Sequence, residues 1–220
     1  MRIDLPSGTP AELVLPDGPA KRALVIAPDV MGLRPLFDDM AARLAAEEGW
    51  AVCAVEPFPG PSGDLALPDR LAHRIDVERL TTDLQLGADL AQERSGAARA
   101  GAIGFCMGGM NVFRAAGTGR FDRAVAFYGM IRPPEPWSAP GDDPLDALAR
   151  AECGDVLAIL GGADHFTPPA DIADLVAVGN HVTVEVYADA EHGFVHDPSR
   201  PAHRPDDAAD AWARVLEFLA

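Results

Sequence analysis

Short apolar runs recur along the chain with longer stretches of helical spacing between them, and this alternation constrains the fold more than any other feature. The runs cover residues 23–27, 51–55, 100–104, 124–127 and 156–160, while residues 182–187 alternate apolar and polar side chains. Nearly continuous apolar runs are typical of parallel strands covered on both faces, and alternation is typical of a strand nearer a sheet edge. The sequence therefore predicts an α/β fold with an open, doubly wound, mostly parallel sheet and helices on both faces.

The helical stretches place apolar residues at i, i+3, i+4 and i+7, which favours amphipathic helices over residues 37–44, 77–84 and 212–219. The Pro-rich segment 131–144 is flanked by strand signals, so we interpret it as a surface excursion. A length of 220 residues suits one large domain, because typical domains have roughly 100–200 residues. We expect a single domain over residues 1–220.

Charge and cysteine content exclude several classes of partner. With 18 basic and 34 acidic residues, the formal net charge of −16 would repel nucleic acid and anionic membranes. No apolar run approaches the roughly 20 residues of a membrane helix. Three cysteines without a CxxC pair, together with no visible secretory signal, predict a reducing, cytoplasmic location.

The most informative segment is residues 100–111, which read AGAIGFCMGGMN. A strand enters Gly104-Phe-Cys106-Met-Gly108 and a helix-compatible stretch follows, which is the G-x-S-x-G nucleophile turn with cysteine in place of serine. The glycines leave room where a Cβ would collide, and the helix N-terminus favours a thiolate. The pattern predicts Cys106 as a nucleophile, and the structural alternative is a buried cysteine beside a packing turn.

A nucleophile of this kind needs a base, and the base needs an orienting carboxylate. Asp164 follows the 156–160 strand in GGADHFTP, and His192 follows the 182–187 strand in AEHGF. Both positions have the chain order and strand-end placement that a nucleophile–acid–histidine triad requires. We therefore predict a triad of Cys106, Asp164 and His192.

Other uses of these residues are less well supported. His165 adjoins the predicted acid and should point elsewhere. His192 and His196 have the i, i+4 spacing of a zinc pair, but Gly193 and the missing glutamate break the H-E-x-x-H helix pattern. No Lys-Ser/Thr pair follows Gly109 as a phosphate-binding loop requires. We expect neither a metal nor a nucleotide.

An oxyanion hole needs one N–H from the residue after the nucleophile, here Met107, and another from the loop after an early strand. That loop is PDVMGLRP, directly after the 23–27 strand, and Val30 is the candidate for the second donor.

Together, PDVMGLRP, GFCMGG, GGADHFTP and AEHGF resemble the dienelactone hydrolase family of α/β-hydrolases, in order and spacing, from about residue 22 to the final helix. The resemblance implies an α/β-hydrolase fold with little or no cap and no cofactor. It implies a triad of Cys106, His192 and Asp164, with Val30 and Met107 as oxyanion donors.

The chain departs from the family pattern at residues near the predicted triad. Family members generally have a glutamate where this chain has Asp29, and that carboxylate is thought to help deprotonate the cysteine, so Asp29 is a candidate to assist the nucleophile. Members that cleave dienelactone hold its carboxylate with arginines. One of these corresponds in position to His196, with Arg200 nearby but not equivalent, and Arg70 or Arg74 could supply another.

Tyr128, at the end of the 124–127 strand, should face the same crevice, and Trp137 is a further candidate. These residues lead us to expect hydrolysis of a small activated ester or lactone through a thioester, by a monomer or small homo-oligomer. The alternatives are a non-catalytic small-molecule binder or thiol sensor, and an enzyme of acyl transfer or thioester hydrolysis.

Overall fold

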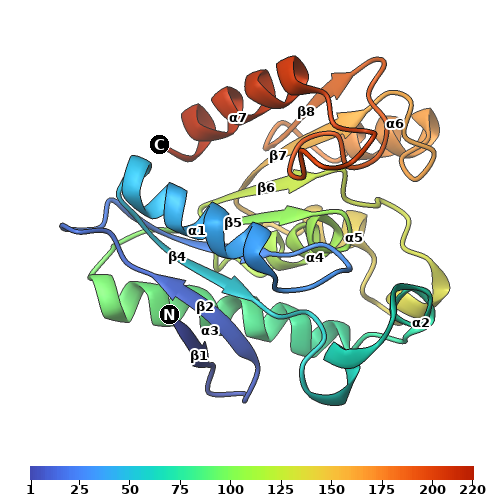
Figure 1. The fold of residues 1–220 in the computed structure, drawn as a ribbon. Helices are drawn as coiled ribbons and strands as arrows, with labels where there is room; N and C mark the ends of the chain where they lie inside the picture. Colours follow the sequence, from blue (N-terminus) through green and yellow to red (C-terminus); the bar gives the residue numbers. More distant parts are fainter.

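An eight-stranded sheet runs through the centre of the computed structural model, which describes residues 1–220 apart from the side chain of Pro61 (Figure 1). Its strands are β1 (Arg2–Asp4), β2 (Pro10–Val14), β3 (Arg22–Ala27), β4 (Trp50–Val55), β5 (Ala100–Phe105), β6 (Arg123–Phe127), β7 (Asp155–Gly161) and β8 (Val182–Tyr187). The spatial order is β1-β2-β4-β3-β5-β6-β7-β8. Strands β3 to β8 are parallel, whereas β1 and β2 are antiparallel additions at one edge.

All six predicted strands are confirmed. The sequence pattern did not predict β1 and β2, whose alternating burial and shortness give weak signals.

Helices cover both faces of the sheet, so the doubly wound prediction is confirmed (Figure 1). The longer helices are α1 (Pro35–Glu48), α3 (Val77–Ser95), α4 (Met107–Ala116), α6 (Pro169–Ala177) and α7 (Pro205–Leu219), and the shorter segments are η1 (Gly60–Asp64), α2 (Leu67–Ala72), η2 (Glu135–Trp137) and α5 (Pro144–Leu148). Helices α1 and α7 bury their apolar sides in a core on one face. Helices α3, α4, α5 and α6 contribute to the core on the other.

The side on which successive strands are added to the sheet changes between β3 and β5. It passes from β3 to β4 on one side and then returns to β5 on the other side of β3. In open α/β sheets, ligands bind beyond the carboxyl ends of the strands at such a switch point. The loops after β3, β5, β6, β7 and β8 therefore converge where a site is expected.

The close crossing of β5 and α4 depends on two glycines. A Cβ on Gly104 would lie 2.3 Å from the carbonyl oxygen of Gly108, and one on Gly108 would lie 2.0 Å from the carbonyl oxygen of Ala27. Backbone atoms cannot give way as flexible side chains do, so these positions admit only glycine.

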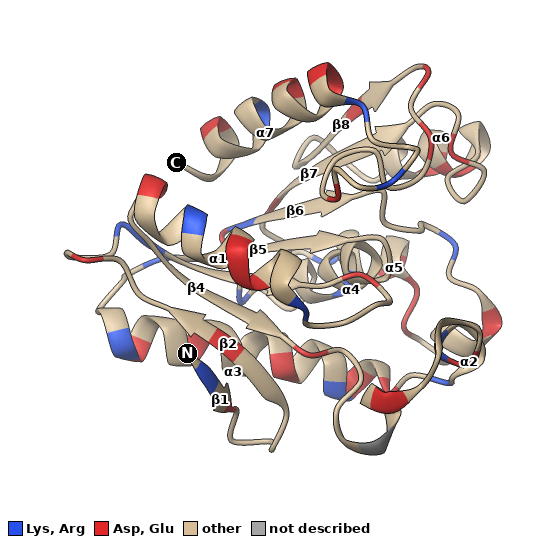
Figure 2. Cartoon of the chain, viewed as in Figure 1, with Lys and Arg blue, Asp and Glu red and all other residues tan. Residues whose placement is uncertain are grey.

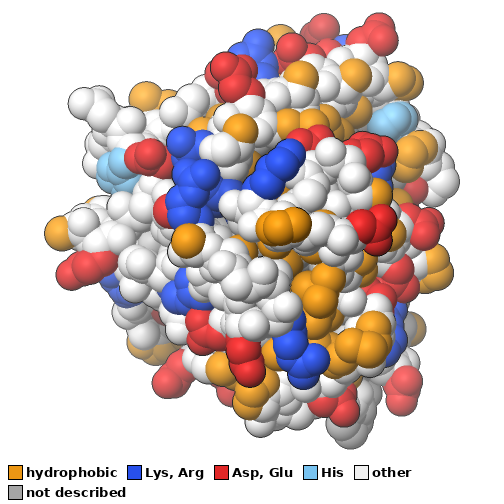
Figure 3. Space-filling model, turned by 90° about the vertical axis from the view of Figure 1, so that its left-hand side faces the viewer, with side chains coloured by type: hydrophobic (Ala, Val, Ile, Leu, Met, Phe, Trp, Pro, Cys, Tyr) orange, Lys and Arg blue, Asp and Glu red, His pale blue; other side chains and the backbone are white. Residues whose placement is uncertain are grey.

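Charged side chains are dispersed over the surface. Acidic residues occur on the exposed sides of α1, α3, α6 and α7 (Figure 2). Basic, acidic and apolar side chains intermingle on the face shown in Figure 3. None of the helices described is long and apolar enough to cross a membrane.

Replacing Gly108 by Ala should lower the free energy of unfolding by about 3 kcal/mol or more, because the new methyl group meets the backbone of β3. Denaturant unfolding checks this, with Gly18→Ala as the control, since a Cβ there would meet nothing within 4 Å. Equal midpoints for the two variants would contradict the steric argument.

Candidate active site

Cys106 lies in the sharp turn between β5 and α4. Its backbone has φ of 56° and ψ of −116°, a conformation that costs energy for a residue with a Cβ. The Cys106 N–H donates to the carbonyl of Phe127 on the neighbouring strand at 3.0 Å, which anchors the turn. The side chain is half-buried and lines a cavity of about 670 Å³.

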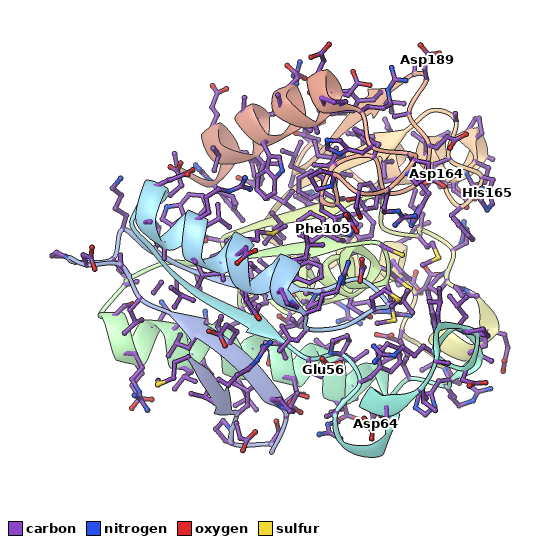
Figure 4. All side chains as sticks on the ribbon, in the orientation of Figure 1. Glu56, Asp64, Phe105, Asp164, His165 and Asp189 are labelled. Carbon is purple, nitrogen blue, oxygen red and sulfur yellow. The ribbon has the colours of Figure 1, made fainter. Side chains whose placement is uncertain are left out.

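The loops after β7 and β8 bring Asp164 and His192 together. His192 Nδ1 donates to Asp164 Oδ2 at 2.7 Å. The other carboxylate oxygen, Oδ1, accepts from the N–H of Phe166 at 2.9 Å, so the carboxylate is oriented from two sides. Asp164 is 3% exposed, whereas the next residue, His165, is exposed. Both side chains are labelled in Figure 4.

His192 lies between Asp164 and Cys106, and its pKa reflects both neighbours. Burial by itself lowers the pKa of His192, but the contacts with Asp164 and Cys106 together outweigh that effect and raise it to about 9. The ring lines the same cavity as Cys106. At neutral pH the site therefore contains an imidazolium beside the sulfur, and the predicted triad residues are together in space.

The loop after β3 is held in a fixed shape beside the turn. Arg70 donates to the carbonyl of Val30 at 3.2 Å, and Glu56 accepts from the N–H of Leu33 at 2.8 Å. Among the described residues, the Val30 N–H has no hydrogen-bond acceptor. The Met107 N–H, in the first turn of α4, has no acceptor within the helix. Val30 lines the cavity, whereas Met107 is buried behind Cys106.

Asp29 is engaged with residues other than the expected sulfur. Its carboxylate accepts from Arg34 at 2.7 and 2.9 Å and from His196 Nε2 at 2.8 Å. Burial raises the pKa of Asp29, but the bonds from His196 and Arg34 outweigh it and hold the pKa well below its usual range. A carboxylate stabilised in this way is a poor proton acceptor, so the geometry does not support the expected help to Cys106.

The structure also corrects the candidate substrate contacts. His196 is buried, its pKa is lowered mainly by burial, and its ring accepts from the hydroxyl of the fully buried Tyr128. Neither residue lines the cavity. Arg74 lies outside it and pairs with Glu135 on the surface. None of these three side chains lines the cavity, so the structure does not support the prediction that they contact the substrate.

Three other arginines line the cavity: Arg34, Arg132 and Arg200. Arg34 is paired with Asp29, and Arg132 with Asp174. Arg200 is half-buried and, among the described residues, has no carboxylate partner; its guanidinium lies over Gly193, next to His192. Sequence reasoning set Arg200 aside because its spacing from His192 differs from the family pattern.

A doubly wound sheet with a nucleophile turn after β5, a carboxylate after β7 and a histidine after β8 defines an α/β-hydrolase. The chain belongs to the dienelactone hydrolase family, whose model matches residues 9–220.

Known relatives and structures agree with this assignment. A Yersinia pestis protein provisionally named a carboxymethylenebutenolidase is 29% identical, with 96% of this chain and 82% of that protein covered. A Bradyrhizobium protein named a probable 2-oxo-3-(5-oxofuran-2-ylidene)propanoate lactonase is 25% identical, over 90% of this chain and 82% of its own length. The Klebsiella pneumoniae structure provisionally named a dienelactone hydrolase superimposes with a TM-score of 0.85 at 24% identity, covering 99% and 96% of the two chains. The fold prediction is confirmed.

The imidazole of His192 should titrate near pH 9 in the wild-type protein and at lower pH in Cys106→Ser, because the substitution removes the sulfur whose contact raises the pKa of His192. NMR of the ring, assigned with His192→Gln, measures both values. A pKa raised above the unfolded value of about 6.5 stabilises the fold fully below that pH, and the contribution is lost as the pH rises through about 9. Titration below pH 7 in both proteins would contradict this electrostatic account.

Proposed function

We propose that the protein hydrolyses small activated esters or lactones with Cys106 as nucleophile, His192 as acid and base, and Asp164 as the group that orients His192. The observation that carries the proposal is the position of the His192 ring, which is held by Asp164 at 2.7 Å and lines the same cavity as Cys106. Its Nε2 atom is buried and has no hydrogen-bond partner among the described residues, so it is available to exchange a proton with a reacting group. The names of the relatives, which include a lactonase, support the same reaction class.

The first half of the reaction forms a thioester. The Cys106 thiolate attacks the carbonyl carbon, and the resulting oxyanion accepts from the N–H groups of Val30 and Met107. When the intermediate collapses, the bond to the ester oxygen breaks and the leaving oxygen takes a proton from His192. In a lactone, the leaving oxygen remains attached to the acyl group.

The second half regenerates the enzyme. His192 accepts a proton from a water molecule, the hydroxide attacks the thioester, and the carbon–sulfur bond breaks to release the acid and restore the thiolate. Thiolate leaves more readily than an ordinary alkoxide, so the first intermediate of an alkyl ester reverts to substrate. Esters with enol or phenol leaving groups should therefore be the better substrates.

Free cysteines accord with the proposed reducing, cytoplasmic environment. Cys53, Cys106 and Cys153 are all unpaired in the structure. Burial raises the pKa of Cys53 to about 12 and that of Cys153 to about 11, which keeps both as thiols. Cys106 is thus the thiol that the proposal assigns to chemistry.

Replacing Cys106 by Ala should reduce kcat/KM for an enol or aryl ester by at least about 1000-fold, since the covalent step is lost. Steady-state hydrolysis of phenyl acetate measures the effect, with Cys153→Ala as a control that should retain activity. Undiminished turnover by the Cys106 variant would remove the proposal.

Arg200 supports a substrate that carries a negative charge. The Arg200 guanidinium is half-buried, lines the same cavity as His192 and has no carboxylate partner among the described residues, so it is suited to bind a carboxylate. The name of the Bradyrhizobium relative includes a propanoate, which is an acid of this kind. We include a carboxylate-bearing ester or lactone in the proposed substrate range.

Arg200→Gln should raise KM for a carboxylate-bearing aryl ester about 10-fold or more. It should change KM for an uncharged ester of equal size by no more than about twofold. Parallel kinetics on the two esters measure this selectivity. An equal loss for both esters would indicate that Arg200 has a structural role only.

A further inference from the structure

One side of the cavity is an apolar wall that the proposed triad chemistry does not use. Two short segments and one loop contribute its residues, which are Leu67, Leu71, Met130, Pro134, Trp137 and Phe166. Five charged residues are also part of the lining: Asp29, Arg34, Arg132, Asp197 and Arg200. At about 670 Å³, the cavity falls in the range of about 300–1,000 Å³ that holds drug-sized ligands, so a five-membered lactone leaves much of it unfilled.

Exposed apolar side chains concentrate at the mouth of this cavity. Among the described side chains, eight large hydrophobic ones are exposed, and four of these line the cavity: Met31, Leu67, Leu71 and Phe166. Isolated exposed apolar residues are ordinary on protein surfaces, whereas a contiguous group around a cavity marks a binding site.

Direct hydrogen bonds hold two of the three parts of the wall in place, namely α2 and the segment that carries Trp137. Arg70 attaches α2, which carries the two leucines, to the carbonyls of Val30 at 3.2 Å and Leu65 at 2.9 Å. The buried Arg114 of α4 donates to the carbonyl of Trp137 at 2.8 Å. The wall is therefore preformed, which limits the ordering cost of binding an apolar group.

We propose that this apolar wall, formed by Leu67, Leu71, Met130, Pro134, Trp137 and Phe166, binds a substrate group at least as large as a phenyl ring. The inference rests on the proposed function and adds a substrate class to it, namely esters or lactones with an aromatic or similarly large apolar substituent. Phe166 belongs both to the wall and to the catalytic centre, because its ring centroid lies 4.9 Å from that of His192. A group on the wall therefore lies within reach of the reacting carbonyl.

Two pairs of uncharged esters test the subsite. The acyl pair is vinyl acetate and vinyl phenylacetate, and the leaving-group pair is vinyl acetate and phenyl acetate, so the smaller ester of each pair carries no group of phenyl size. After correction for spontaneous hydrolysis rates, the larger member of at least one pair should have a kcat/KM about 10- to 100-fold higher.

The double variant Leu67→Gln/Leu71→Gln should reduce that preference about 10-fold. It should change kcat/KM for the smaller ester by no more than about twofold. Glutamine is close in size to leucine and neutral, so the substitution changes polarity without adding charge. Leu15→Gln is the matched control, since Leu15 is 44% exposed, as Leu67 and Leu71 are 42% and 48%, but lies outside the cavity lining.

The outcomes separate the subsite from the catalytic proposal. The subsite is overturned if neither larger ester is preferred, or if the preference survives in the double variant, while hydrolysis of the smaller esters still depends on Cys106. Hydrolysis that is insensitive to Cys106→Ala instead overturns the proposed function, whatever the size preference.

Discussion

The close crossing of β5, α4 and the end of β3 is the constraint on which the rest of the site depends. With 2.0 Å between a Cβ of Gly108 and the Ala27 carbonyl oxygen, the helix can approach the strands only through glycine. This approach places Cys106 at a positive φ and directs the N-terminus of α4 at the loop after β3. The turn that holds Cys106, the proposed oxyanion donors and the cavity thus depend on one steric condition.

The polar residues around this crossing fall into two groups, those that bond to one another and one that has no partner in the described part of the chain. Tyr128, His196, Asp29 and Arg34 form a continuous hydrogen-bonded chain that joins the loops after β6, β8 and β3. Because these four side chains satisfy one another's hydrogen-bonding groups, the network stabilises the loops and leaves few polar groups to bind a ligand. Arg200 has no such partner among the described residues, so its charge is available within the cavity of an acidic protein.

The sequence patterns predicted the features of the structure that depend on chain order and on periodicity. Apolar runs located the six parallel strands. The order of Cys106, Asp164 and His192 at strand ends predicted that they lie close together, and the structure places Cys106 and His192 in one cavity lining with Asp164 bonded to His192. Side-chain partners on loops were not predictable: the position of Asp29 after β3 gave no sign of its bonds to Arg34 and His196. The leucines of α2 gave no signal either, because a six-residue helix is too short for a periodic pattern.

Intact-protein mass spectrometry during turnover of an aryl ester tests the central claim most directly. After rapid mixing and acid quench, the protein should gain the mass of the acyl group transiently, and peptide mapping should locate it on Cys106. The adduct should decay as acid product accumulates and persist when His192 is replaced by Gln, because water is then no longer activated. Turnover without any adduct, or an acyl group on another residue, would contradict the account.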